Sequence, residues 1–288
     1  MLLWVIMKTK SILEKFTKDL ETKKRSISTI LAYRKDIEQL IELEKAEEVE
    51  KIKKEDIEDF KEKLKTKGYT TKSISRKINA IKSFFRFAKA KGWVQTDPSS
   101  TVTHPKYELK PPRVLSRIEY RALRDACRED IRLAATIELL LQTGMRIGEL
   151  ARLTLDDVRV DKNLIKIKQY QSQSGRKIPL NNPVKKALKG YLEARPKSRN
   201  KILFLTKTGN PFLVRNIRSA INRYFKIADI KDARVNDLRN TFIVQQLKSG
   251  VPLVTVSKIV GHKRISTTEK YLELVEEKSK ERVKLEEL

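Results

Sequence analysis

The sequence is poor in cysteine, in histidine and in long apolar runs. Cys127 is the single cysteine of 288 residues, so no disulfide can form within the chain, which suits a reducing cytoplasm. The two histidines, His104 and His262, are far apart and have no acidic cluster beside them, so we expect no bound metal ion. The apolar start, residues 1–8, is too short for a signal peptide or a membrane span. These absences predict a cytoplasmic protein without a membrane segment.

Acidic residues are scarce relative to basic ones. The chain has 64 lysine and arginine residues against 37 aspartate and glutamate residues, a formal net charge of +27 at pH 7. Residues 1–105 contain 24 basic and 16 acidic side chains, which gives +8 there and leaves +19 for residues 106–288. A Lys/Glu-rich surface of the thermophilic kind explains a high charge but not this imbalance, whereas a nucleic-acid partner explains both. The composition therefore favours binding to a nucleic acid.

Apolar residues recur at helical spacing in four segments of the first hundred residues, namely 11–20, 28–43, 54–64 and 71–90. We expect residues 1–100 to form a small all-helical domain. The last segment has a clear apolar face, and its other face has five basic residues, Lys72, Arg76, Lys77, Lys82 and Arg86. These five side chains either bind DNA or form an ordinary hydrated surface.

Residues 101–114 belong to a proline-rich stretch with little periodicity, which predicts an extended linker. A capping box at Ser116–Glu119 opens the second domain, residues 115–288. Residues 131–141 predict a buried helix, and residues 163–180 predict a β-hairpin with a glycine-containing turn, to which Ile202–Leu205 could add a third strand. The expected fold is mainly α with a small hairpin or three-stranded sheet.

Three residue types that suit phosphodiester chemistry cluster between residues 233 and 272. Arg239 lies in an amphipathic helical pattern that Gly250 ends, and a second apolar run ends at Gly261 and His262. Tyr271 follows His262 by nine residues, just beyond a helix-start signal at Ser266–Glu269. The guanidinium would hold a phosphate, the imidazole would donate to an oxygen and the phenol would attack phosphorus. The alternatives are a helix cap for His262 and ordinary packing for Tyr271.

A second arginine stands earlier in the chain, in the stretch Thr143-Gly144-Met145-Arg146-Ile147-Gly148-Glu149-Leu150. Arg146 follows a helix break and begins another helix that we expect to end near Leu153. An arginine in a turn between buried helices is held rigidly, as phosphate recognition requires. The alternative is a surface ion pair of Arg146 with Glu149 or Asp157.

The two stretches together resemble the TGxRxxEL box and the LR…GH…Y motif of the tyrosine recombinases, the integrase family that includes the Xer proteins. The resemblance covers residues 113 to 275 strongly and the N-terminal third in general character only. It implies a DNA clamp built from a SAM-like helical core-binding domain and a mixed α+β catalytic domain. In it, Arg146, Arg239 and His262 would bind the scissile phosphate and Tyr271 would attack it.

By the same resemblance, the chain is expected to be a site-specific recombinase that acts through a 3′-phosphotyrosyl intermediate and needs no cofactor. Its partner would be double-stranded DNA, and a homotetramer would assemble on two DNA sites. The charged tail, residues 274–288, would contact a neighbouring subunit. The resemblance leaves open an Xer-like role and the role of a mobile-element integrase.

The chain departs from the family at the groups that transfer protons. The family's hairpin lysine, the general acid for the leaving 5′ oxygen, corresponds here to Gln171 or Gln173. Lys166, Lys168 and Lys177 are nearby, and a mobile hairpin could bring one of them in, but the sequence does not single one out. The family's histidine three residues before the second arginine is Asn236, which can donate hydrogen bonds but not transfer a proton.

The position after Arg239, often histidine in the family, is also an asparagine, Asn240. These departures leave two alternatives to recombination. One is a catalytically weakened DNA-binding protein on the same fold, and the other is a nicking-closing enzyme similar to type IB topoisomerases.

Overall fold

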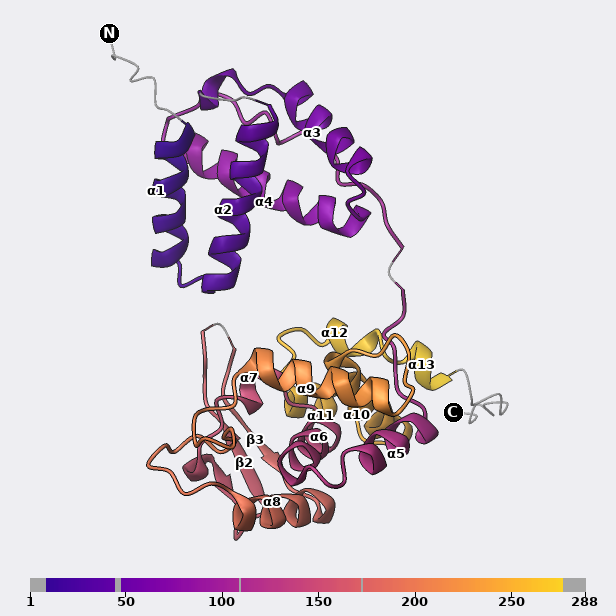
Figure 1. Cartoon of the computed structure of the whole chain (residues 1–288). Coiled ribbons are helices and arrows are strands. Elements are labelled where there is room, and N and C mark those ends of the chain that lie inside the picture. The colour runs from indigo at the N-terminus through magenta and orange to yellow at the C-terminus, as the bar shows by residue number, and fades with distance from the viewer. Residues whose placement is uncertain (1–8, 45–47, 109, 172, 277–288) are drawn as a thin grey trace, which may run out of the picture. The chain divides into compact units, whose positions relative to one another are not determined.

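A computed structural model of the chain describes residues 9–44, 48–108, 110–171 and 173–276. Backbone proximity divides the chain into two compact units, Met1–Leu109 and Lys110–Leu288 (Figure 1). The division falls inside the stretch that the sequence predicts as a linker. Each unit has a buried core of its own and is described by itself. Within the described residues, no helix combines the length and the apolar character that crossing a membrane requires.

Over its described residues, the N-terminal unit is a bundle of four α-helices. Its helices are α1 (Thr9–Thr22), α2 (Ile27–Leu43), α3 (Lys54–Thr66) and α4 (Thr71–Ala90), and a short 3₁₀ helix, Val49–Lys51, precedes α3. Helices α1 and α2 lie side by side and pack on α4 (Figure 1). The apolar face of α4 is fully buried at Ile78, Ile81 and Phe84, as its spacing predicts. The four predicted helices are therefore confirmed to within two residues at each end.

The prediction that five basic residues share the outer face of α4 is wrong for Lys77. Its side chain is buried and pairs with the buried carboxylate of Asp36 at 2.8 Å, because position 77 adjoins the apolar stripe and Asp36 requires a counter-charge there. Arg76 is half-exposed and also binds Asp36, with Nη2 3.0 Å from Oδ1. Lys82 donates to the carbonyl oxygen of Ser100 at 3.3 Å. Two members of the set, Lys72 and Arg86, are exposed and have no ion pair in the described part of the chain.

The C-terminal unit is mainly helical around one central apolar helix, α6 (Ile131–Thr143), which packs on α8 and α10. The capping box at Ser116–Glu119 is confirmed at the start of α5. Cys127 ends α5 as a buried residue, and burial raises the pKa of its thiol to about 11. The remaining helices are α5 (Arg117–Ala126), α7 (Ile147–Leu150), α8 (Asn182–Ala194), α9 (Val214–Ile227), α10 (Val235–Lys248), α11 (Leu253–Val260), α12 (Ser266–Glu269) and α13 (Glu273–Glu276).

Three antiparallel strands in the order β1-β2-β3 form the sheet of this unit, namely β1 (Val158–Arg159), β2 (Leu164–Ile167) and β3 (Arg176–Pro179). The predicted hairpin is confirmed, with Ile165 opposite Ile178 on the buried face. The predicted third strand at Ile202–Leu205 is wrong, since this segment makes only isolated bridges.

Side chains of α8 and its C-cap replace strand pairing in that segment. The hydroxyl of Tyr191 donates to the carbonyl oxygen of Leu203 and accepts from the amide of Leu205, and Arg195 binds the carbonyl oxygens of Leu203 and Ile202. Together with single backbone bonds from Leu203 to Leu153 and from Phe212 to Phe204, these bonds satisfy the polar backbone groups of a buried segment that forms no strand ladder. The third strand is instead the short segment β1.

Candidate active site

Helix α10 is buried on almost every side, and it brings Arg239 into the interior of the C-terminal unit. The Arg239 side chain is 5% exposed, and its Nη1 donates to the carbonyl oxygen of Gly144, the residue that ends α6, at 2.5 Å. Gly144 has φ 59°, and a Cβ there would lie 2.3 Å from the ring of Phe242. The second terminal nitrogen of Arg239, Nη2, is buried and has no partner among the described residues. It is therefore a donor free to bind an anion.

Arg146 is the N-cap of α7, which ends at Leu150 rather than near Leu153. Its guanidinium is about one-third exposed and donates through Nη1 to Glu149 Oε1 at 3.1 Å and through Nη2 to the Gly261 carbonyl oxygen at 3.0 Å. The ion pair with Glu149 that we considered as an alternative does form. It orients Arg146 without closing it off from solvent, so the two interpretations are compatible.

Glu149 is the buried carboxylate on which two arginines converge. It accepts two hydrogen bonds of 2.8 Å from Nη1 and Nη2 of Arg176, and its Oε2 accepts the backbone N–H of Arg146 at 2.8 Å. Burial alone would raise the pKa of Glu149, but the hydrogen bonds and charges of Arg176 and Arg146 lower it to about 2. Glu149 is thus a carboxylate at any physiological pH.

Arg176, the first residue of β3, is a member of the site that our sequence analysis missed. Its guanidinium is buried, and its Nε donates to the carbonyl oxygen of Ile259 at 2.5 Å. Gly261, with φ 70°, packs so closely that a Cβ there would meet Arg176 Nη1 at 2.9 Å. The sequence did contain an indication that Arg176 is buried. Side chains two residues apart in a strand lie on the same face, so Arg176 lies on the face of buried Ile178 and not on that of exposed Lys177.

His262 follows the left-handed Gly261 directly, and its Nδ1 lies 2.8 Å from the hydroxyl of Thr268. Burial, followed by the charges of Arg239, Arg146 and Arg176, lowers the pKa of His262 to about 4. The imidazole is therefore neutral at pH 7. The other histidine, His104, belongs to the N-terminal unit, where its ring contacts Ser75.

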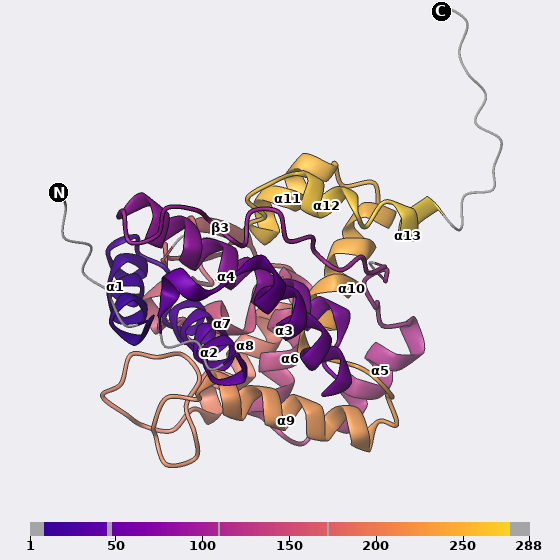
Figure 2. The same cartoon turned by 90° about the horizontal axis from the view of Figure 1, so that it is seen from above.

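Tyr271 lies in the turn between α12 and α13 rather than inside a helix. Figure 2 shows these two short helices following one another near the C-terminal end of the described chain. The helix start predicted at Ser266–Glu269 is confirmed by α12, but Ser266 is already helical and the preceding Ile265 makes no side-chain cap. Tyr271 is 8% exposed, and its hydroxyl donates to Oδ1 of Asn240 at 2.8 Å. Burial raises the pKa of the phenol, while the charge of Arg239 acts in the opposite direction. The ring stacks at 6.4 Å from that of His262.

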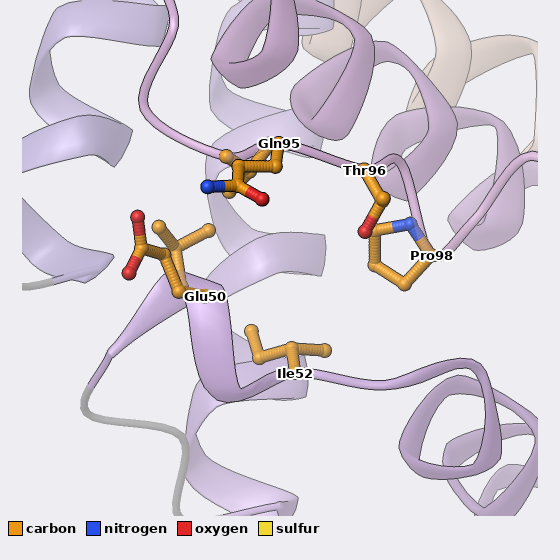
Figure 3. A pocket seen from close by; sticks show the side chains of 7 residues that line it. Glu50, Ile52, Gln95, Thr96 and Pro98 are labelled. Atoms are coloured by element: carbon orange, nitrogen blue, oxygen red, sulfur yellow. The ribbon is translucent and has the colours of Figure 1, made fainter.

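A cavity of about 450 Å³ opens where α7, α9, α10 and the tip of the β2–β3 hairpin meet. Its charged lining is four arginines and one carboxylate, namely Arg146, Arg152, Arg218, Arg239 and Glu149. Such a lining suits a phosphate group. By contrast, Glu50 is the only charged residue among the described residues that line a cavity of about 350 Å³ in the N-terminal unit (Figure 3).

The hairpin tip presents amides, not amines, to the arginine-lined cavity. Gln171 and Gln173 both line it, and Gln171 has φ 51° in the tight turn there. Lys168 is turned away and pairs with Asp157 at 3.0 Å, and Lys177 is exposed on β3 outside this lining. Asn236 lines the cavity, and its Nδ2 donates to Asn240 Oδ1 at 3.2 Å. The structure therefore brings Gln171, Gln173 and Asn236 to the arginines. None of the hairpin lysines Lys166, Lys168 and Lys177 lines this cavity.

No group of three or more histidine, cysteine, aspartate and glutamate side chains that could hold a metal ion occurs among the described residues. The side chains of this site supply guanidinium, carboxylate, neutral imidazole, amide and phenol groups. These groups can bind an anion, neutralise its charge and attack it with an oxygen nucleophile.

Comparison with known proteins agrees with this geometry. Residues 113–278 match the phage integrase family, and residues 13–92 match the phage integrase N-terminal SAM-like domain. A tyrosine recombinase XerD of Staphylococcus saprophyticus is 32% identical over 91% of this chain and 93% of its own. A tyrosine recombinase XerC of Roseiflexus castenholzii is 30% identical over 88% of this chain and 85% of its own.

Solved structures give the same result. The crystal structure of XerA recombinase aligns with 96% of this chain and all of its own at 26% identity, with a TM-score of 0.55. A lambda integrase dimer bound to a core site aligns at 17% identity over 97% of this chain and 80% of its own, with a TM-score of 0.78, which is a likeness of fold. With both domains matched in order, the chain belongs to the phage integrase family of tyrosine recombinases.

Proposed function

We propose that this protein is a site-specific DNA recombinase that cuts and rejoins duplex DNA through a tyrosine. The observation that carries the proposal is the buried guanidinium of Arg239. Its Nη2 has no partner among the described residues, and Arg239 lines the same cavity as Arg146. A desolvated guanidinium without a counter-ion is costly unless an anion joins it. The phosphate of a DNA backbone is the anion that suits a chain with a net charge of +27.

The proposed reaction is an exchange of phosphate esters. Arg146 and Arg239 would bind the non-bridging oxygens of the scissile phosphate and stabilise the charge of the pentacoordinate transition state. A bond would form between the Tyr271 hydroxyl oxygen and phosphorus while the bond from phosphorus to the 5′ oxygen breaks. The phenol proton would pass to water, and the leaving oxygen would take a proton from water. Attack by the 5′-hydroxyl of a partner strand would reverse the step.

Neutral His262 would hydrogen-bond the same phosphate, and Gln171 or Gln173 would donate a hydrogen bond to the leaving oxygen. An amide donates without releasing its proton, so it stabilises the departing charge less than an ammonium group would. We expect turnover to be slow for this reason.

Duplex DNA would contact both units, with Lys72 and Arg86 of α4 available to the phosphates. A homotetramer on two DNA sites fits this reaction, and a lambda integrase tetramer bound to a Holliday junction is among the similar structures. The tail segment proposed to contact a neighbouring subunit lies, from residue 277 onward, outside the described residues. A protein with this activity would reside with the nucleoid in the cytoplasm.

A covalent trap tests the proposal. The protein is incubated with sheared host DNA and quenched with detergent, and DNA-linked protein is measured for the wild type, for Tyr271→Phe and for the control Tyr224→Phe. We expect adducts in the wild type and the control and none in Tyr271→Phe. Sequencing the attached DNA would identify the site. Equal adducts in all three proteins would contradict the proposal.

A second candidate function is DNA binding on the recombinase fold without efficient cleavage, which the amides at positions 171, 173 and 236 favour. It predicts DNA retention that Tyr271→Phe leaves unchanged, with no adduct in either protein. A nicking-closing enzyme would instead relax plasmids without preference for a site. The SAM-like N-terminal domain argues against that third function.

A further inference from the structure

Asn240 sits at the centre of a hydrogen-bond network beside the proposed nucleophile. It is 4% exposed, and its Oδ1 accepts from the Tyr271 hydroxyl at 2.8 Å and from Asn236 at 3.2 Å. Its Nδ2 donates to the Arg113 carbonyl oxygen at 3.1 Å and to Asp237 Oδ1 at 3.2 Å. Oδ1 thus accepts two hydrogen bonds and Nδ2 donates two, so both polar atoms of the Asn240 side chain are satisfied.

The surroundings fix which way the Asn240 amide points. A carbonyl oxygen and a carboxylate face Nδ2, and neither can donate, so the amide cannot be flipped without breaking both bonds. Oδ1 must therefore face Tyr271, and the phenol proton must point at Oδ1. A side-chain amide cannot take that proton. The hydroxyl of Tyr271 is consequently held as a neutral donor.

The network also reaches the segment that enters the C-terminal unit from the linker. Arg113, whose carbonyl oxygen binds Asn240, is held by its own guanidinium to Glu119 at 2.7 Å and to the Lys231 carbonyl oxygen at 2.8 Å. One residue further along α10, the hydroxyl of Thr241 accepts the Leu115 amide at 2.9 Å. The amide that binds the nucleophile is thus anchored on linker backbone.

We propose that Asn240 is a positioning residue that ties the hydroxyl of Tyr271 to the linker backbone at Arg113 and so restrains the nucleophile until this hydrogen bond breaks. The inference rests on the proposed function, in which Tyr271 must lose its proton to attack phosphorus. An acceptor bound to the neutral phenol stabilises the neutral form and so opposes ionisation. Movement of the linker on DNA binding would disturb the Arg113 carbonyl and release the restraint.

Other charged groups also face the phenol. Arg239 of α10 favours ionisation, Asp237 of α10 opposes it, and His262 is neutral at pH 7. The chain neighbours Lys270 and Glu273 are exposed. Of these groups, only Asp237 bonds Asn240 and loses a hydrogen bond when Asn240 is replaced. A carboxylate remains ionised at the alkaline pH at which a phenol titrates, so the charge that Asp237 exerts on Tyr271 is the same in the variant. A shift in the titration of Tyr271 therefore reports on the amide.

The test compares Asn240→Leu with Thr241→Val in the full-length protein. Both replace a buried polar side chain of α10 that binds the linker segment, but Thr241 makes no hydrogen bond to Tyr271. Tyrosine labelled with ¹³C at Cζ is titrated by NMR, and the Tyr271 signal is the one missing in Tyr271→Phe. In Asn240→Leu we expect ionisation of Tyr271 at lower pH, and about fivefold faster adduct formation at pH 7, the size of one hydrogen bond. Thr241→Val should leave the titration of Tyr271 unchanged.

An unchanged titration of Tyr271 in Asn240→Leu would overturn the inference, as would the same shift in both variants. If Asn240→Leu does not fold, Asn240→Ser replaces it in the test, because serine keeps a small polar group at this position. The same shift in the titration of Tyr271 is expected of Asn240→Ser. Adducts that persist in Tyr271→Phe would overturn the proposed function instead, and the NMR titration would still decide whether Asn240 holds the phenol.

Discussion

At the scale of single residues, the site depends on a few buried groups that each hold another in place. Glu149 orients Arg146 and Arg176, Gly144 accepts from Arg239, and Thr268 binds His262. Only the groups with family motifs were recognisable in the sequence. Arg176 was missed because a basic residue on a hairpin of a basic protein looks like surface until its buried partner Glu149 is known.

Replacing Glu149 with glutamine should destabilise the fold and slow cleavage. Breaking a buried ion pair by removing one partner costs about 3 kcal/mol or more. The folded-state pKa of Glu149 is lowered from 4.5 to about 2, so its ionised form stabilises the fold fully above pH 4.5 and loses this effect as the pH falls toward 2. The difference in the free energy of unfolding between wild type and Glu149→Gln, measured in urea, should therefore shrink between pH 4.5 and pH 2. A difference that is constant with pH would contradict this role.

Arg176→Lys should reduce adduct formation about tenfold with little effect on DNA affinity. Lysine keeps the charge but not the planar fork that binds both oxygens of Glu149 and the Ile259 carbonyl oxygen, so Arg146 would lose its alignment. Lys177→Arg, at the next residue of the same strand, is the matched control and should behave as wild type. If both variants cleave equally well, Arg176 does not position Arg146.

At the scale of elements, helices were predictable and the connections between them were not. The apolar stripes of α4 and α6 and the alternation of the hairpin each follow a period that the sequence displays. The segment Ile202–Leu205 was wrongly predicted as a strand because its backbone is satisfied by Tyr191, by Arg195 and by single backbone bonds outside any ladder. The spacing of apolar residues cannot show bonds of this kind.

Two helices end at glycines with a left-handed backbone conformation, and only one of these glycines packs against another residue. Substituting alanine at each separates the cost of the backbone conformation from the cost of a steric clash. Gly250 ends α10 with φ 80° and open space around its Cα, whereas Gly261 ends α11 against Arg176. Gly250→Ala should cost about 1–2 kcal/mol of stability, from backbone conformation alone, and leave cleavage unchanged. Gly261→Ala should cost more and also abolish adducts, because its Cβ displaces Arg176. Thermal unfolding and the adduct assay separate the two effects, and equal results for both variants would contradict the account.

At the scale of the whole molecule, two units with separate cores share one excess of positive charge. The sequence predicted this organisation from periodicity and the proline-rich linker. It did not show that Asp36 binds two of the basic side chains of α4, since Asp36 and Arg76 are forty residues apart. Proximity of that kind comes from the packing of α2 on α4.

The free basic residues of α4 should contribute to DNA affinity through counterion release. Lys72→Gln combined with Arg86→Gln should reduce the slope of log affinity against log salt by about 1.8, or about 0.9 for each lost phosphate contact. Lys18→Gln combined with Lys35→Gln, two exposed lysines of α1 and α2, should change the slope less. Fluorescence anisotropy over a salt series measures the slope for both double variants. Equal slopes for the two would show that the DNA does not contact Lys72 and Arg86.

The chemistry at Tyr271 is tested most directly by locating the nucleotide on the protein. Covalent complexes are digested with nuclease and trypsin, and the peptides are sequenced by mass spectrometry. The account predicts a nucleotide linked through its 3′-phosphate to the hydroxyl of Tyr271 and to no other residue. A nucleotide on another side chain, or DNA binding with no modified peptide at all, would contradict it.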